Sequence, residues 1–203
     1  MKKTAVTKKV ISKKSVIKKV KKVVTKKLLA KKLVAKKSIP KKTKAKKSAP
    51  KSVASVGSQV PRFALPSSNG DVISSAGLLG SRYVLYFYPK DETSGCTVEA
   101  NEFTELGKKF ATAGVQIFGV SPDTIASHIK FIEKDKISFP LLADVGHAVA
   151  ELFGVWVTKS MYGKEYMGIE RATFVIDRSG KIESAYRNVK AEGHAVCVLK
   201  DIK

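Results

Sequence analysis

The chain has 203 residues but only two cysteines, Cys96 and Cys197, and its first 51 residues contain no acidic side chain. Two cysteines are too few for the disulfide framework of a small secreted protein. No apolar run approaches the roughly 20 residues that a membrane-spanning helix needs. The positive–apolar–small pattern of a secretory signal is also missing. We therefore expect an intracellular, reducing compartment.

Metal and nucleotide chemistry also find little support. The three histidines, His128, His147 and His194, are scattered without the spacing of metal ligands. No glycine-rich phosphate loop of Walker type is present. Trp156 and the stretch 161–167 indicate packing or a loop rather than a cofactor site. We expect no metal and no cofactor, and interpret the histidines as ordinary core or surface residues.

What the sequence does contain is a thiol at the junction of a strand and a helix. The apolar run 83–87 predicts a strand, and a helical pattern begins at Thr97, directly after Cys96. Backbone N–H groups at a helix N-terminus favour an anion, and the thiolate is the reactive form of cysteine. Pro89, Thr93 and Cys96 form the pattern P-x-x-x-T-x-x-C.

A reactive thiolate needs hydrogen-bonding groups nearby and a cation that holds the negative charge. The Thr93 hydroxyl can both accept and donate a hydrogen bond, and Pro89 can stiffen the turn and screen the sulfur. Arg171 is the candidate cation, because a guanidinium stays charged and offers its donors in a fixed fork. The alternatives are a buried structural thiol at Cys96 and a surface ion pair at Arg171.

Three segments resemble the bacterioferritin-comigratory-protein branch of the peroxiredoxins, also called peroxiredoxin Q. They are YFYPKD (86–91), GCTVEA (95–100) and YGKEYMGIERATFVID (162–177). The similarity extends from about residue 60 to the C-terminus. The resemblance implies a thioredoxin-like fold and a thiol peroxidase that reduces hydrogen peroxide or alkyl hydroperoxides, with thioredoxin, glutaredoxin or a small thiol as reductant.

The resemblance also implies a role for each matching residue. Cys96 corresponds to the attacking thiolate, and Pro89 to its shield. Thr93 and Arg171 correspond to the activating residues. Glu99 matches the family pattern as well, and we expect it to orient Arg171.

The chain departs from the family at the second cysteine. Asn101 stands where many members carry a resolving cysteine, and the helical segment 127–135 contains none. After attack, the sulfenic acid on Cys96 must condense with a thiol. Three routes are open: an external thiol, Cys197 of the same chain, or Cys197 of a second chain. Cys197 lies in the apolar segment 194–199, where its alternative role is a packed core thiol.

The positive charge of the chain is concentrated at its N-terminus. Residues 1–51 hold 22 of the 39 lysines and arginines and none of the 17 acidic residues, so the remainder is formally neutral. Lysine pairs recur mostly every five residues, a step that turns a helix by about 500° and spreads charge around its axis. Like charges repel, so we expect a disordered tail, followed by a linker at 52–59.

The lysine-rich tail resembles those of linker histones and bacterial histone-like proteins. Lysines that neutralise phosphates release counterions, which gives strong, salt-sensitive binding without sequence preference. We expect duplex DNA as the partner, with RNA second, in the nucleoid of a bacterium or the nucleus of a eukaryote. The alternatives are a charged solubility tail and an anionic membrane surface. The candidate binding residues are Lys13, Lys14, Lys18, Lys19, Lys26, Lys27, Lys31, Lys32, Lys36 and Lys37.

Residues 60–203 are long enough for one domain with a full core. Strand patterns occur at 83–88, 116–120, 172–176 and 182–186, and helical patterns at 97–113, 124–135, 149–153 and 193–202. The turn 177–180 predicts a hairpin, and Asp123 is a candidate helix N-cap. We expect an α/β, thioredoxin-like domain, a central mixed sheet flanked by helices, in a monomer.

These features favour a thiol peroxidase tethered to DNA by its basic tail. Two other functions remain open from the sequence. One is a histone-like DNA-binding protein whose peroxiredoxin domain is idle. The other is a thiol redox sensor that passes oxidation from Cys96 to a partner.

Overall fold

The computed structural model of the chain describes residues 54–161 and 163–202. The lysine-rich tail, residues 1–51, lies outside this part, as do its candidate DNA-binding lysines and the first two residues of the linker. The expected disorder of the tail therefore stays a prediction. Within the described residues, no helix combines the length and apolar character needed to cross a membrane.

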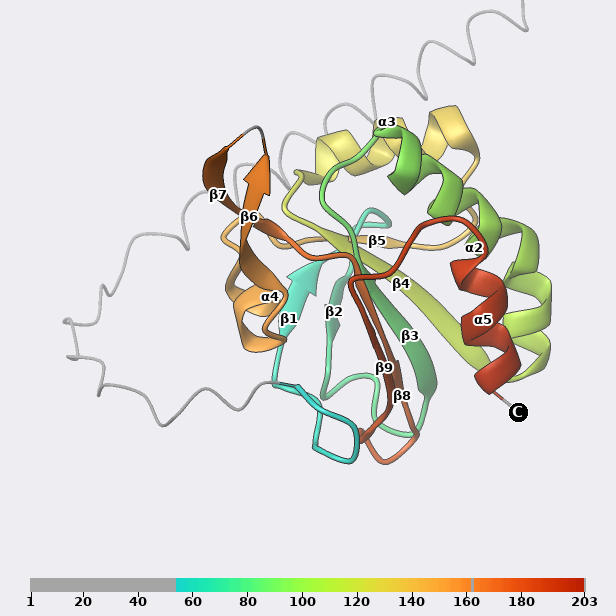
Figure 1. Ribbon diagram of the computed structural model, residues 1–203. Helices are drawn as coiled ribbons and strands as arrows, with labels where there is room; N and C mark the ends of the chain where they lie inside the picture. The colour runs from blue at the N-terminus through green and yellow to red at the C-terminus, as the bar shows by residue number, and fades with distance from the viewer. Residues whose placement is uncertain (1–53, 162, 203) are drawn as a thin grey trace, which may run out of the picture. The chain divides into compact units, whose positions relative to one another are not determined.

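The domain alternates strands and helices along the chain (Figure 1). In chain order the elements are β1 (Ala64–Pro66), β2 (Val72–Ser74), β3 (Arg82–Phe87), α2 (Ser94–Thr112), β4 (Val115–Ser121), α3 (Ile125–Asp135), β5 (Leu141–Ala143), α4 (Ala148–Leu152), β6 (Trp156–Met161), β7 (Lys164–Ile169), β8 (Ala172–Ile176), β9 (Ile182–Arg187) and α5 (His194–Asp201).

A five-stranded sheet in the order β5-β4-β3-β8-β9 forms the centre of the domain. Strand β4 pairs in parallel with both β3 and β5, whereas β8 pairs antiparallel with both β3 and β9. The predicted hairpin at 177–180 is confirmed as the connection between β8 and β9. The sheet is mixed, and the thioredoxin-like fold is confirmed. The β1–β2 and β6–β7 pairs form two small separate sheets.

Side chains of the central strand β3 alternate between two hydrophobic clusters, as the period of a strand requires. Val84 and Tyr86 pack with α2, α3 and α5 on one face, while Leu85 and Phe87 pack with α4 and β1 on the other. Figure 1 shows the helices on opposite sides of the sheet. Because both faces are covered, β3 is almost entirely buried, which explains its continuous apolar sequence.

Helix α2 begins three residues before the predicted start at Thr97, so Cys96 lies in its first turn. The helix buries Cys96, Ala100 and Phe103, which follow one another at the spacing of one helical face. The ring of Phe103 stacks on Tyr86 of β3, with the ring centroids 4.8 Å apart. This packing fixes the N-terminal turn of α2 against the sheet, and with it the position of the thiol.

Two local predictions need correction. Asp123 is not the N-cap of α3, because the adjacent Thr124 accepts the hydrogen bond from the Ser127 N–H at 3.3 Å. The stretch 161–167 is mostly strand and not loop, because Met161 ends β6 and Lys164 begins β7, and the two strands pair as a hairpin. The hairpin escaped prediction because most of β7 is exposed and carries charged and polar residues, without a buried alternating face.

Candidate active site

Cys96 follows directly from the junction between β3 and α2. Strand β3 ends at Phe87, and Thr93 has the extended backbone of an N-cap residue, so the thiol enters the first turn of the helix. The first N–H groups of a helix have no intrahelical partner and stabilise negative charge. Cys96 is only 2% exposed. The fold thus places a shielded sulfur where an anion is favoured.

The register of the sheet brings Arg171 to this thiol. Ala172, the first residue of β8, pairs with Phe87, the last residue of β3. The residue before β8 therefore lies beside the loop that leads to Cys96. Arg171 Nη2 donates a hydrogen bond to Cys96 Sγ at 3.3 Å. The structure thus brings together the predicted nucleophile and the predicted cation.

Glu99 holds the other side of the same guanidinium. It follows Cys96 by three residues on α2, and its Oε2 accepts a short hydrogen bond from Arg171 Nη1. Glu99 is fully buried, and burial raises its pKa to about 7 against the opposing effect of Arg171. Burial alone would lower the pKa of Arg171, but Glu99 and Cys96 outweigh it and raise that pKa, so the guanidinium stays charged. Glu99 therefore lies where an orienting residue is expected.

The structure places Thr93 and Pro89 in the loop before α2, and the Thr93 hydroxyl is not hydrogen-bonded to the sulfur. Thr93 is exposed, and its hydroxyl donates to the Lys90 carbonyl oxygen at 3.2 Å. Pro89 is half-buried in the same loop. Among the described residues, the hydrogen bond to Cys96 Sγ from a side chain comes from Arg171. The roles of Thr93 and Pro89 remain predictions.

A second cation near the site was missed from the sequence. Burial lowers the pKa of Lys159 on β6, and the positive charge of Arg171 lowers it further, while Glu170 and Cys96 act in the opposite direction. Lys159 therefore lies within electrostatic range of the thiol. Lys159 was not singled out from the sequence because the β6–β7 hairpin that carries this residue was not predicted.

Cys197 lies on α5 and is exposed. Its interpretation as a packed core thiol is therefore wrong, while its resolving role stays a prediction. The histidines are core or half-buried residues, as expected: His128 and His194 are buried, and His147 is half-buried. Over residues 54–161 and 163–202, no group of three or more His, Cys, Asp or Glu side chains could hold a metal ion.

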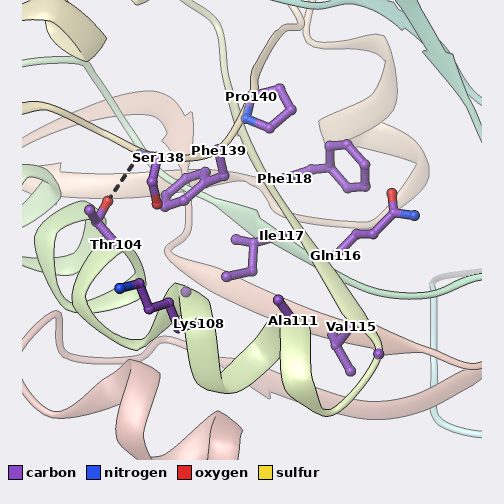
Figure 2. A pocket seen from close by; sticks show the side chains of 12 residues that line it. Thr104, Lys108, Ala111, Val115, Gln116, Ile117, Phe118, Ser138, Phe139 and Pro140 are labelled. Atoms are coloured by element: carbon purple, nitrogen blue, oxygen red, sulfur yellow. Dashed lines mark hydrogen bonds between the residues drawn. The ribbon is translucent and has the colours of Figure 1, made fainter.

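A pocket of about 720 Å³ lies between α2, the start of β4 and the loop before β5 (Figure 2). Its lining is mostly apolar and does not include Cys96, Thr93 or Arg171. We therefore assign it no part in the chemistry of the thiol. The lining residues labelled in Figure 2 are Thr104, Lys108, Ala111, Val115, Gln116, Ile117, Phe118, Ser138, Phe139 and Pro140.

Comparison with known proteins identifies the family of the chain. The AhpC/TSA family matches residues 56–185. The peroxiredoxin Bcp of Bacillus subtilis is 43% identical over 148 residues, which cover 73% of this chain and 94% of the relative. The peroxiredoxin Bcp of Escherichia coli is 40% identical over 147 residues, which cover 72% of this chain and 94% of the relative.

Solved structures give the same result. A structure of Xanthomonas campestris peroxiredoxin Q superposes with a TM-score of 0.66 at 41% identity, and covers 69% of this chain and 89% of that one. A structure of the bacterioferritin comigratory protein of the same organism has the same TM-score and identity and comes from work on its alkyl peroxide reduction activity. The protein therefore belongs to the AhpC/TSA family, in its Bcp or peroxiredoxin Q branch, and is a thiol peroxidase of the peroxiredoxin class.

Proposed function

We propose that the protein reduces hydrogen peroxide and alkyl hydroperoxides through Cys96. The observation that carries this proposal is the 3.3 Å hydrogen bond from Arg171 Nη2 to Cys96 Sγ, in the first turn of a helix. A guanidinium and the helix N-terminus can both stabilise negative charge that develops on the sulfur and the peroxide during the reaction. The similar X. campestris protein, with its alkyl peroxide reduction activity, supports the same substrate class.

In the first half-reaction the Cys96 thiolate attacks the terminal oxygen of ROOH. The S–O bond forms as the O–O bond breaks, so Cys96 becomes a sulfenic acid and RO⁻ leaves and takes up a proton. The sulfur loses two electrons and the peroxide gains them. Arg171 lies where it can stabilise charge on the sulfur and on the peroxide oxygens in the transition state. Thr93 contributes a hydrogen bond to the peroxide if its hydroxyl turns away from the Lys90 carbonyl oxygen. Pro89 limits the access of water to the sulfur.

In the second half-reaction an external thiol condenses with the sulfenic acid and releases water. A second thiol then reduces the mixed disulfide and restores Cys96. Asn101 at the usual position of a resolving cysteine supports this external route, with thioredoxin, glutaredoxin or a small thiol as the donor. The exposed Cys197 keeps a second route open, because an accessible thiol can meet a sulfenic acid of its own or another chain.

The lysine-rich tail adds a binding function to this enzyme. Its 22 lysines without one acidic residue favour a polyanion, and duplex DNA is the partner we propose. The enzyme then removes peroxide close to DNA, in the nucleoid or the nucleus. A histone-like protein with an idle domain is the weaker candidate, because such a protein has no need for a guanidinium on a buried sulfur.

Two cysteine variants of the full chain test the proposal. Cys96→Ser should abolish consumption of cumene hydroperoxide in the presence of thioredoxin and its reductase, and should leave DNA affinity unchanged. Cys197→Ser is the matched control and should keep most of the turnover if the external route operates. Full turnover by Cys96→Ser would refute the assignment of the nucleophile.

A further inference from the structure

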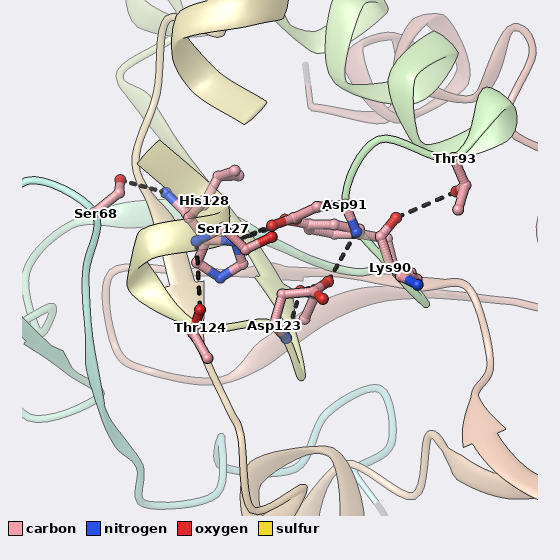
Figure 3. A network of polar contacts seen from close by, with 11 residues as sticks. Ser68, Lys90, Asp91, Thr93, Asp123, Thr124, Ser127 and His128 are labelled. Atoms are coloured by element: carbon pink, nitrogen blue, oxygen red, sulfur yellow. Dashed lines mark hydrogen bonds and ion pairs between the residues drawn. The ribbon is translucent and has the colours of Figure 1, made fainter. Parts of the chain in front are cut away.

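A buried, hydrogen-bonded pair of side chains, His128 and Asp91, lies beside the loop between β3 and α2, just before Cys96. His128 of α3 places its Nδ1 atom 2.9 Å from Asp91 Oδ2 and 3.2 Å from Asp91 Oδ1. Asp91 belongs to the loop between β3 and α2, five residues before Cys96. Figure 3 shows its carboxylate directed at the imidazole. The pair is out of contact with solvent, since His128 is fully buried and Asp91 is 5% exposed.

The Asp91 carboxylate receives further donors from its own loop. The Tyr88 hydroxyl donates to Asp91 Oδ1 at 2.8 Å. Burial would raise the pKa of Asp91, but the hydrogen bonds and charge of its neighbours, His128 first among them, hold it below its ordinary value. An ionised carboxylate only accepts hydrogen bonds, so Nδ1 of His128 carries the donated proton. The carboxylate thus joins α3 and the end of β3 to the loop.

The backbone of the same residue is fixed separately. The Asp91 N–H donates to Asp123 Oδ2 at 2.8 Å, and the Ser121 hydroxyl donates to the same oxygen at 2.9 Å. Asp123 therefore serves as an anchor for the loop instead of the helix cap that its sequence position suggests. Side chain and main chain of Asp91 are held from two elements, α3 and the end of β4.

Two features of the loop and the first turn of α2 indicate that the loop must be held in place. Glu92 adopts a left-handed backbone with φ of 57°, a conformation that a non-glycine residue keeps only when its surroundings enforce it. Two residues further on the helix begins, and a Cβ atom on Gly95 would lie 3.3 Å from Arg171 Nη2. A small shift of the loop therefore changes the distance between the guanidinium and the sulfur.

We propose that Asp91 and His128 are positioning residues for the peroxidase reaction, which hold the loop so that Cys96 meets Arg171. The inference rests on the proposed role of Cys96 as the attacking thiol. Neither side chain is hydrogen-bonded to the sulfur, and both act through the backbone between Asp91 and Cys96. The competing explanation is a buried pair that contributes only to folding stability.

A pair of substitutions at one position separates these explanations. His128→Leu fills the cavity with an apolar side chain and removes the donor. His128→Asn keeps an N–H donor at the position of Nδ1, although it packs less well. If the pair contributes only packing stability, His128→Leu should be tolerated better than His128→Asn. If the hydrogen bond positions the loop, His128→Asn should keep more of the activity of Cys96. Lys134→Ala is the matched control, because it removes only the exposed ion pair between Lys134 of α3 and Glu92 of the same loop, with its atoms 3.5 Å apart.

The full chain with Cys197→Ser serves as the background, so that every thiol signal comes from Cys96. Three quantities are measured: the rate of Cys96 oxidation by hydrogen peroxide, the rate of its alkylation by iodoacetamide, and the thermal midpoint. His128→Leu should slow oxidation about tenfold or more and speed alkylation, because a displaced loop separates Cys96 from Arg171 and exposes the sulfur. His128→Asn and Lys134→Ala should stay within about threefold of the background in both rates.

An unchanged oxidation rate in His128→Leu, or equal losses in the Leu and Asn variants, overturns the inference. A background protein whose Cys96 resists peroxide overturns the proposed function itself, so the two failures are distinguishable. If His128→Leu does not fold, Tyr88→Phe decides, since it removes one donor to Asp91 and keeps the ring. A loss of about threefold in oxidation rate then supports positioning, and an unchanged rate overturns it.

Discussion

Arg171 Nη2 lies 3.3 Å from the sulfur of Cys96, although 75 residues separate the two in the chain. The same guanidinium reaches Glu99 with its other terminal nitrogen. One planar group therefore connects the thiol to a carboxylate one helical turn away. This arrangement ties the reactivity of the thiol to the orientation of a single side chain.

Arg171→Lys should slow the oxidation of Cys96 by hydrogen peroxide by about 10²-fold, the usual effect of losing one oriented donor at a developing charge. A lysine keeps the charge, but one ammonium group cannot reach both Cys96 and Glu99 in the fork geometry of a guanidinium. Rapid mixing followed by mass analysis of Cys96 measures the rate. Arg178→Lys, at an exposed position, is the control. An Arg171→Lys enzyme that reacts at the normal rate would show that only net charge matters.

Glu99 should make the protein less stable as the pH rises. Its pKa is raised from 4.5 to about 7, so between these values the folded state binds more protons than the unfolded state. The free energy of unfolding contributed by Glu99 is therefore lost as the pH rises through this window. Urea denaturation from about pH 5 to about pH 8 should show the wild type weakening relative to Glu99→Gln. A constant difference between the two proteins would contradict the raised pKa.

His194 should have the opposite effect. Burial, assisted by the positive charge of Arg171, lowers its pKa from 6.5 to about 4, and its Nε2 lies 2.8 Å from the Thr173 hydroxyl oxygen. The unfolded state therefore binds more protons between these values, and stability is lost as the pH falls from 6.5 toward 4. His194→Gln, which keeps a polar group near Thr173, should reduce that loss. Equal acid sensitivity of both proteins would exclude His194 as the source.

The pH ranges over which Glu99 and His194 change stability overlap, and the two effects have opposite signs. The pH dependence of the wild-type stability alone therefore cannot be assigned to either residue. Each variant should change the curve in its own direction. Glu99→Gln should make the protein relatively more stable toward neutral pH. His194→Gln should make it relatively more stable in acid.

The sequence was sufficient for the parts of the fold whose residues carry a strong local pattern. The aromatic and β-branched run of β3 and the helical face of α2 were predicted because both are buried and regular. The short β5 and the exposed β6–β7 hairpin were not, since their pairing depends on neighbours supplied by the tertiary structure. Asp123 was assigned to the wrong role because the cap preference does not distinguish it from the adjacent Thr124.

The residues of the site also differ in whether a local sequence pattern predicts them. Cys96 follows from a local strand-turn-helix pattern, whereas the place of Arg171 beside it depends on the pairing of β8 with β3. Nothing in the sequence indicated the contact of Asp91 with His128, because 37 residues separate them and each is unremarkable by itself. Long-range register and burial therefore decide the parts of the site that local patterns leave open.

Deletion of residues 1–51 should remove DNA binding and leave peroxide consumption intact, since the tail carries the whole net charge of +22. If half of its lysines neutralise phosphates, the logarithm of the affinity should fall with the logarithm of the salt concentration with a slope of about −10. Fluorescence anisotropy with a duplex of arbitrary sequence measures both quantities. Undiminished affinity of the shortened chain would place the DNA site outside residues 1–51.

The most direct test of the central claim is the intact mass and free-thiol count after one equivalent of hydrogen peroxide, without reductant, for the wild type and Cys197→Ser. Oxidation of Cys96 in both proteins, with a persistent sulfenic acid and a mass increase of about 16 Da, is the predicted result. A disulfide found only in the wild type would assign the resolving role to Cys197 and leave Cys96 as the nucleophile. A Cys96 thiol that remains reduced in both proteins would contradict the account.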